Sequence, residues 1–182
     1  MAHFDDIYEI AADNYGLITY AEAKEAGITG GELDRWTSSG RLLRKGRGVY
    51  QLARREPTPY DLYAEATALV GPDSVIWGDS VLAMLELAYE NPPVVYVSSP
   101  RRVRKTLPPW VKLTYGAVAN RQIYEGVPCQ ALPEAIRVCK GHVLPERLLA
   151  AIHEAAVRGL ITNAEAKMLK EDVHECSQET KQ

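Results

Sequence analysis

The sequence predicts an α+β protein built from two domains. Its 182 residues are 46% hydrophobic and 25% charged, which is the composition of a globular protein long enough for one large domain or two small ones. Helix signals come first, short segments rich in β-branched residues come later, and a charged, proline-containing stretch at 53–59 lies between them. We therefore expect domains at residues 1–55 and 58–174, followed by a polar, frayed tail at 175–182.

The first domain opens with an amphipathic helix signal. Phe4, Ile7 and Ile10 recur at three-residue spacing, and acidic residues occupy the positions between them. This spacing places the apolar side chains on one face of a helix, which we expect to end near Gly16.

Two Thr-x-x-Glu motifs mark the next two helix starts. In such a motif the threonine and glutamate side chains each satisfy a free backbone N–H at the first turn of the helix. The motif at Thr19 predicts a short helix to Ala26, and the motif at Thr29 predicts a helix to Ser39. Two apolar residues of the latter helix should face the core: Leu33 and Trp36.

A β-hairpin is predicted directly after the third helix. Residues 41–45 and 48–52 read as short extended segments, and the glycines at 46 and 48 permit the positive φ of a tight reversal. Three short helices followed by a hairpin form the pattern of a winged helix-turn-helix. In this fold the later helix enters the DNA major groove and the hairpin, called the wing, lies along the DNA backbone.

Charge is distributed in blocks along the chain. The formal net charge is −3, from 21 Lys and Arg against 24 Asp and Glu, and this total by itself disfavours a nucleic-acid partner. Residues 1–34 hold eight acids and one base, whereas residues 35–55 hold seven bases and no acid. Because the basic block falls on the predicted third helix and wing, it indicates DNA binding, although a merely solvated face is the alternative.

Eight residues are the candidates for DNA contact: Gly30, Gly31, Arg35 and Ser38 on the helix, and Arg41, Arg44, Lys45 and Arg47 beyond it. Arg35 is the best candidate for recognising a DNA base, because a guanidinium can make two hydrogen bonds to guanine. An ion pair between Arg35 and a neighbouring acid is nearly as well supported. The backbone at residues 46 and 48 should approach phosphate closely, with Arg47 beside it. About five neutralised phosphates would make log affinity fall against log salt with a slope near −4 to −5.

The second domain should combine helices with a small, mainly antiparallel sheet. A Thr-x-x-Asp motif at Thr58, with proline at the first helical position, predicts a helix that ends before Gly71. Pro128 places the last strand on a sheet edge, since proline cannot donate a ladder hydrogen bond. The remaining expected elements are strands at 94–97, 111–115, 121–124 and 127–130 and helices at 79–87, 133–140, 145–158 and 164–173.

Several motifs resemble the AbiEi family of antitoxins of type IV toxin-antitoxin systems. Those of the first domain are Gly16-Leu-Ile-Thr, Ala23-Lys-Glu-Ala-Gly27, Gly40-Arg-Leu and Arg44-Lys-Gly-Arg-Gly-Val-Tyr50. Those of the second domain are Gly71-Pro-Asp-Ser-Val-Ile, Val95-Tyr-Val-Ser-Ser-Pro100, Glu125-Gly-Val-Pro128 and Arg158-Gly-Leu-Ile-Thr162. The chain departs from the family pattern at 77–79 and 138–140.

The resemblance implies a DNA-binding antitoxin that acts in phage defence. Such a protein represses its own operon by binding double-stranded operator DNA in its promoter. Its second domain counters a nucleotidyltransferase-like toxin encoded next to it, without necessarily forming a stable complex with that toxin.

A second basic cluster follows the strand predicted at 94–97. It consists of Arg101, Arg102, Arg104 and Lys105. Prolines follow it, so we expect an exposed loop that is a second phosphate contact, a surface for the toxin, or merely solvated.

Enzyme and metal-site signals are weak. The chain has no GxSxG, P-loop, HExxH or GxGxxG motif, so we expect no enzyme activity, no catalytic residue and no cofactor. The pairs Cys139 with His142 and His174 with Cys176 each supply two ligands where a closed zinc site needs four, so we expect no metal ion.

Two alternative functions remain open on the sequence. A carboxylate set of Asp61, Glu65 and Asp79 leaves open a nuclease that the first domain directs to DNA. A ligand-responsive winged-helix repressor without a toxin partner is the other alternative.

No apolar run approaches the roughly 18 residues of a membrane helix, and the acidic start differs from a signal peptide. We expect a cytoplasmic protein that has no membrane partner and, lacking a heptad seam, is a monomer in solution.

Overall fold

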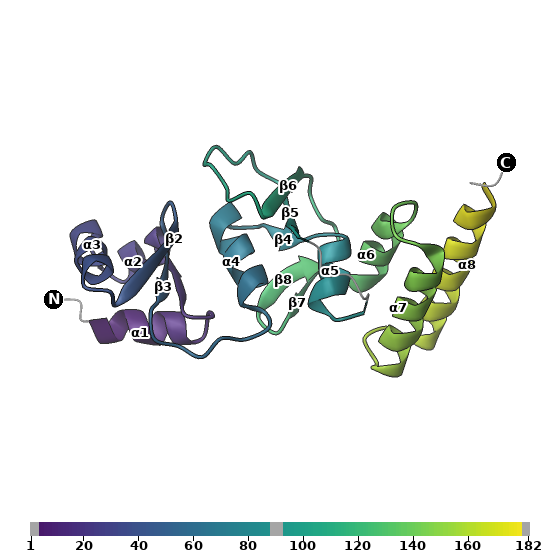
Figure 1. The fold of residues 1–182 in the computed structure, drawn as a ribbon, viewed down its shortest axis with the longest axis horizontal. Coiled ribbons are helices and arrows are strands. Elements are labelled where there is room, and N and C mark those ends of the chain that lie inside the picture. The colour runs from purple at the N-terminus through teal and green to yellow at the C-terminus, as the bar shows by residue number, and fades with distance from the viewer. Residues whose placement is uncertain (1–3, 88–92, 180–182) are drawn as a thin grey trace.

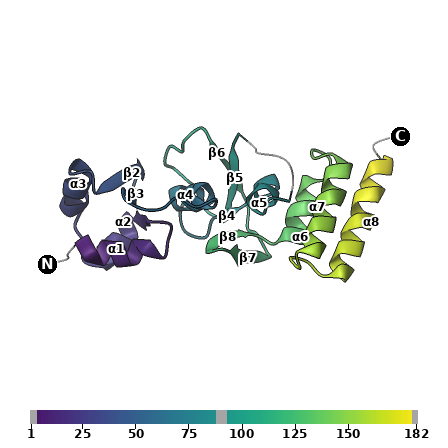
Figure 2. The ribbon, with the colours of Figure 1, turned by 60° about the horizontal axis from the view of Figure 1, so that its bottom comes forward.

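The computed structural model describes residues 4–87 and 93–179 and has the α+β architecture that the sequence predicts. Three units follow one another along the long axis of the molecule (Figure 1). The N-terminal helices and their sheet come first, a central sheet with its helices comes next, and a helical hairpin forms the C-terminal end. The rotated view in Figure 2 shows the same order.

The first unit is a three-helix winged fold. Its elements are α1 (Phe4–Ala12), β1 (Leu17–Thr19), α2 (Tyr20–Glu25), α3 (Gly30–Ser38), β2 (Leu42–Gly46) and β3 (Val49–Leu52). Both predicted Thr-x-x-Glu boxes form, with Thr19 and Thr29 as N-caps. The strands make an antiparallel sheet in the order β1-β3-β2. Strand β1 was not predicted, because three residues are too few to show an alternating pattern and the strand exists only through its pairing with β3.

A compact apolar core holds these elements together. Ile7 of α1, Ile18 of β1 and Leu33 of α3 are completely buried in it. The Phe4 ring stands edge-on to the Trp36 ring, with centroids 5.4 Å apart. Because α3 commits Leu33 and Trp36 to this core, as predicted, its other face is left for solvent.

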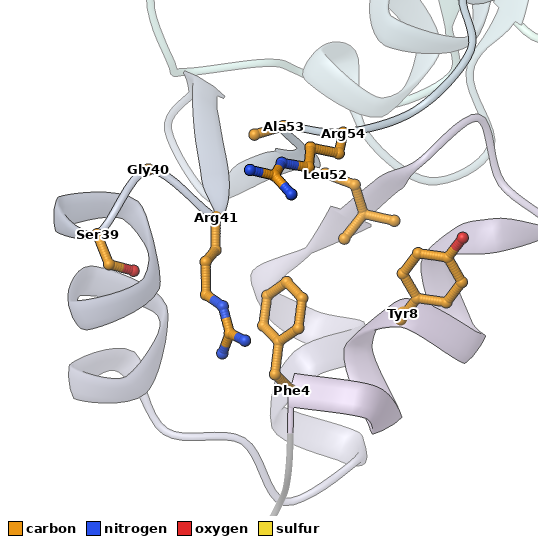
Figure 3. Close-up of a pocket in the computed structure, with 8 residues that line it drawn as sticks. All are labelled: Phe4, Tyr8, Ser39, Gly40, Arg41, Leu52, Ala53 and Arg54. Atoms are coloured by element: carbon orange, nitrogen blue, oxygen red, sulfur yellow. The ribbon is translucent and has the colours of Figure 1, made fainter.

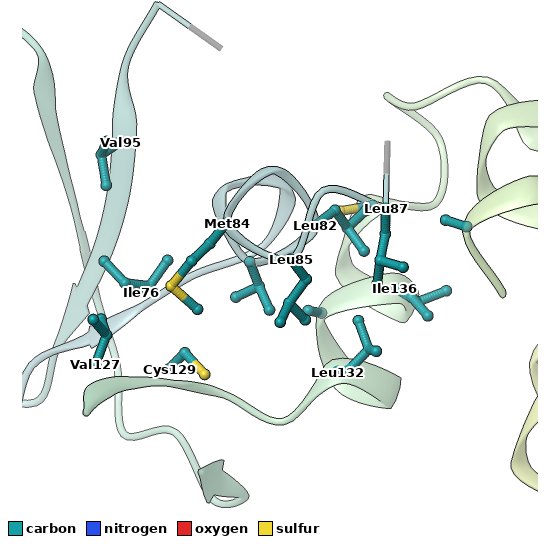
Figure 4. Close-up of a cluster of buried hydrophobic side chains, with 14 of the residues drawn as sticks. Ile76, Leu82, Met84, Leu85, Leu87, Val95, Val127, Cys129, Leu132 and Ile136 are labelled. Carbon is teal, nitrogen blue, oxygen red and sulfur yellow. The ribbon is translucent and has the colours of Figure 1, made fainter. Parts of the chain in front are cut away.

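The remaining elements are built around a five-stranded sheet. They are α4 (Asp61–Val70), β4 (Val75–Ile76), α5 (Asp79–Met84), β5 (Val95–Ser99), β6 (Val111–Tyr115), β7 (Arg121–Tyr124), β8 (Val127–Gln130), α6 (Leu132–Cys139), α7 (Pro145–Val157) and α8 (Asn163–Glu179). The strand order is β6-β5-β4-β8-β7. Side chains of β4, β8, α5 and α6 interdigitate in its core, among them Ile76, Met84, Cys129 and Ile136 (Figure 4).

Two details of this sheet differ from the sequence-based expectation. The sheet is mixed rather than mainly antiparallel, since β5 with β6 and β4 with β8 pair in parallel. Strand β8, which contains Pro128, is also not an edge strand, because β7 lies outside it. The proline is tolerated there because β4 is only two residues long and pairs with β8 through Ile76 and Cys129 alone, so the ladder does not need the missing amide.

Helix α4 connects the first unit to the central sheet. It contacts β1 and β2 on one side and β4, β5 and β8 on the other, and five of its side chains are buried: Ala64, Ala66, Thr67, Leu69 and Val70. Leu69 lies directly against Gly46 at the end of β2, and Lys45 Nζ is 2.7 Å from Glu65 Oε2. Helix α4 is apolar on more than one face, and each of these faces is buried against a different part of the protein.

The C-terminal end is more helical than expected. Helix α8 continues to Glu179, through most of the stretch expected to be a frayed tail, and residues 180–182 lie outside the described residues. Within the described ranges, none of the helices combines the length and the apolarity that crossing a membrane requires.

The packing of Gly46 against Leu69 gives a stability prediction. Gly46→Ala places a Cβ against the buried Leu69 side chain, and such overpacking should lower the free energy of unfolding by about 1–3 kcal/mol in urea denaturation. Gly31→Ala is the matched control. Gly31 lies in α3 with open space around it, so its substitution should raise the free energy of unfolding by up to about 1 kcal/mol.

A double variant tests the cause. Because Leu69→Ala removes the colliding methyl groups, Gly46→Ala should be nearly neutral in that background. Equal destabilisation by Gly46→Ala with and without Leu69 would contradict the predicted contact.

Candidate nucleic-acid interface

Helix α3 presents one polar face to solvent. The Thr29 hydroxyl accepts a hydrogen bond from the Glu32 N–H at 3.3 Å, and the Glu32 carboxylate accepts one from the Thr29 N–H at 2.9 Å, which fixes the first turn. The exposed positions that follow are Gly31, Asp34, Arg35 and Ser38. Gly30 is half-buried beside the Tyr20 ring, so of the four residues predicted on this helix it is the least accessible.

Arg35 is held only weakly within the protein. Its side chain is 69% exposed, and its Nη2 atom lies 3.9 Å from Glu32 Oε1, beyond hydrogen-bond distance. The Glu32 carboxylate is occupied by the Thr29 N–H and hydroxyl, whose hydrogen bonds hold the pKa of Glu32 below its ordinary value. The ion pair considered as an alternative role for Arg35 is therefore formed, but it leaves the guanidinium able to reach a base edge.

The wing divides its basic residues between two faces. Arg44 and Arg47 are exposed, whereas Lys45 points to α4 and pairs there with Glu65. The register between β2 and β3 shifts between Arg44 and Gly46, and after this shift Lys45 and Gly46 both face α4. Gly46 is covered by Leu69, so its backbone approaches α4 rather than a phosphate. Gly48 has the positive φ, +72°, that the reversal requires.

Arg41 lies at the base of the wing rather than at its tip. Its guanidinium carbon is 4.3 Å from the centroid of the Phe4 ring, a cation–π geometry. Figure 3 shows that both side chains border a hollow between α1 and the start of β2, together with Tyr8 and Arg54. Arg41 therefore contributes positive charge beside α1.

Arg55, the last base of the basic block, anchors the linker. It makes two hydrogen bonds to the Asp61 carboxylate, one of them 2.9 Å from Nη1 to Oδ1. Burial by itself raises the pKa of Asp61, but the hydrogen bonds from Arg55 and Thr58 outweigh it and leave the pKa below its ordinary value. This ion pair joins the end of the first unit to the start of α4.

These ion pairs also account for two of the carboxylates considered for a nuclease. Asp61 binds Arg55 and Glu65 binds Lys45. Across the part of the chain that the structure describes, Asp61, Glu65 and Asp79 do not form a group that could hold a metal ion.

The second basic cluster comes close to the wing, which sequence analysis did not anticipate. The loop between β5 and β6 extends over α4 towards β2 and β3 (Figure 1), and Lys105 lines the same groove as Arg47 and Gly48. Burial, and next the charge of Arg47, lower the pKa of Lys105. The other cluster members are exposed, and Arg101 Nη2 pairs with Asp73 Oδ2 at 2.9 Å. No sequence signal connects residues 47 and 105, because α4 and β5 lie between them.

The first unit matches a known family of regulators. Residues 5–53 match the family model described as the transcriptional regulator, AbiEi antitoxin. The matched range contains α1 except Phe4, together with α2, α3 and both strands of the wing. No match was found among curated proteins.

A solved structure is also similar in outline. The crystal structure of the RV2827C protein from Mycobacterium tuberculosis aligns with 14% sequence identity and a TM-score of 0.45, over 91% of this chain and 79% of that chain. The family match confirms, for residues 5–53, the resemblance noted in the sequence: this part of the chain matches the model of the AbiEi antitoxin family of transcriptional regulators.

Proposed function

We propose that this protein is a DNA-binding antitoxin and transcriptional autorepressor of a type IV toxin-antitoxin operon. One observation carries the proposal. The segment that matches the AbiEi regulators is a winged fold with exposed basic residues. These are Arg35 on α3 and Arg44 and Arg47 on the wing, and their side chains point into solvent.

In the proposed complex α3 enters the major groove of the operator. Arg35 binds a guanine edge, Gly31 allows the helix to approach closely, and Ser38 contacts the DNA backbone. Arg44 and Arg47 bind phosphates from the wing. Lys45 and Gly46 have a different role, because their contacts with Glu65 and Leu69 on α4 hold the wing in one orientation before DNA arrives.

The division of the wing into two faces gives a prediction about DNA affinity. Arg44→Ala with Arg47→Ala removes two phosphate contacts. The double variant should bind its own promoter more weakly, and the slope of log affinity against log salt should become shallower by about 2 in a mobility-shift series.

Two controls accompany this measurement. Lys45→Ala should leave the salt slope nearly unchanged, because Lys45 pairs with Glu65. Lys167→Ala, on the exposed surface of α8 at the other end of the molecule, should leave both affinity and slope unchanged. Unaltered affinity in the arginine double variant would reject the wing model.

The second basic cluster supports an extension of the same DNA surface. Lys105 lies beside Arg47, so a phosphate bound at the wing tip would reduce the repulsion between the two cations. We assign Arg102, Arg104 and Lys105 to the DNA backbone beyond the wing. Arg101 is paired with Asp73, so it contributes less to DNA binding than the other three residues.

This assignment predicts a sequence-independent effect. The triple variant Arg102→Ala, Arg104→Ala, Lys105→Ala should weaken binding to operator and unrelated DNA by similar factors, with a salt slope shallower by up to about 3. Loss of toxin neutralisation with unchanged DNA binding would instead assign the cluster to the toxin.

The antitoxin part of the proposal concerns the residues after the linker. We propose that they counter a nucleotidyltransferase-like toxin encoded beside this gene, with no stable complex needed. Support comes from the family match and from the motif resemblance that continues through the second domain to Thr162.

Co-expression tests this part separately from DNA binding. If the neighbouring gene product arrests growth, both the wild-type chain and the Arg44→Ala, Arg47→Ala variant should restore growth, while only the wild type represses a promoter fusion. Arrest that persists with wild-type protein would reject the antitoxin role and leave a winged-helix repressor.

A further inference from the structure

Three side chains with metal-binding atoms meet where α5 packs against α6. Asp79 is the first residue of α5, Cys139 is the last residue of α6, and His142 lies in the loop that follows. One ligand atom from each, a carboxylate oxygen, a thiol sulfur and an imidazole nitrogen, all lie within 4.8 Å of one another. The sequence places only Cys139 and His142 close together, and the packing of α5 on α6 adds the third group.

The backbone positions all three residues. Gly78 has a φ of +57° and donates its N–H to the buried Gln130 side chain at 3.1 Å, which fixes the entry to α5 and therefore Asp79. Gly141 has a φ of +89°, a conformation that favours glycine, and it turns His142 back towards the end of α6. The N–H groups of His142 and Val143 both donate to the Cys139 carbonyl, at 3.3 and 3.0 Å.

The three groups differ in burial in a way that suits an ion held at the surface of the core. Cys139 is 0% exposed, Asp79 is half-buried and His142 is exposed. An ion between them would have the thiolate on its inner side and the imidazole on its outer side. Ligand atoms of one zinc ion stand roughly 3–4 Å apart, given bonds of about 2.0–2.3 Å, so the present spacing, within 4.8 Å, is close to the one that a single ion needs.

The chemistry of the donors selects the metal. Calcium and magnesium prefer sites made of oxygen alone, whereas a thiolate and an imidazole with one carboxylate suit zinc. We propose that Asp79, Cys139 and His142 bind a single zinc ion, with water as the fourth ligand. This revises the sequence-based expectation of no metal ion, which considered the Cys139 and His142 pair without Asp79.

The proposed ion would join two parts of the fold. Asp79 belongs to the central unit, whereas His142 lies in the loop that leads to α7 and the C-terminal hairpin. Bound zinc would therefore stabilise the folded chain by an amount that rises with the logarithm of the ratio of its concentration to its dissociation constant. The site is remote from α3 and the wing, so it does not depend on the proposed DNA function.

The chain contains its own control groups. Cys129 is also a buried thiol, and burial raises its pKa to about 11, but among the described residues it belongs to no group of potential metal ligands. His153 is exposed on α7 and is likewise outside such a group. The side chain of Cys176, considered earlier with His174, lies outside the described residues.

Cobalt substitution tests the site directly. The full chain, without a histidine tag and stripped of metal by a chelator, is titrated with Co²⁺ and then with Zn²⁺. We expect one equivalent of Co²⁺ to give a thiolate-to-cobalt charge-transfer band that Zn²⁺ abolishes. Competition with a chromophoric chelator then measures the zinc affinity.

Variants at the three positions complete the test. Cys139→Ser should remove the charge-transfer band, and Asp79→Asn and His142→Ala should each weaken zinc binding by more than about tenfold. Cys139 is buried, so Cys139→Ser could fail to fold. In that case the variants at the more accessible Asp79 and His142 still test the site. Cys129→Ser and His153→Ala should bind zinc as the wild type does.

Three results would overturn the proposal. They are the absence of equimolar uptake by the wild-type chain, a charge-transfer band that persists in folded Cys139→Ser, and zinc affinity unchanged in both Asp79→Asn and His142→Ala.

Discussion

The burial of α4 between two sheets is the constraint on which the rest of the structure depends. Leu69 fills the space left by the absent side chain of Gly46, Glu65 neutralises Lys45, and the other buried side chains of the helix pack on the five-stranded sheet. The apolar cluster of the central sheet consequently includes Leu17 and Val49 from the first unit. The winged fold is thereby fixed to the body of the molecule instead of hanging from a flexible linker.

This packing also decides which charges are available to a partner. A two-stranded wing has two faces, and α4 covers one of them, so only the side chains on the other face are open to a partner. The same docking brings the loop between β5 and β6 to the wing, where Lys105 meets Arg47. Positive charge from two distant stretches of sequence thus gathers around one end of α4, while Arg55 and Lys45 are neutralised by Asp61 and Glu65.

Much of the fold could be predicted because its signals are local. The Thr29 box, the spacing of Leu33 and Trp36, and the strands after residue 94 each depend on neighbours within a few residues. The misassigned features depend on distant partners instead. β1 exists by pairing with β3, the parallel pairs require chain crossovers, and Pro128 is acceptable inside the sheet because β4 is short.

The sequence by itself determined the local elements, the basic block that coincides with α3 and the wing, and the resemblance to AbiEi antitoxins, because each is carried by residues adjacent in the chain. Only the tertiary structure decided which bases are free, since Lys45 and Arg44 are neighbours in sequence and differ only in what packs against them. It alone also brought Asp79 to Cys139 and His142. The physical reason is the same in both cases: ion pairs and metal ligands require atoms within a few ångströms, and packing between elements, not spacing along the chain, sets those distances.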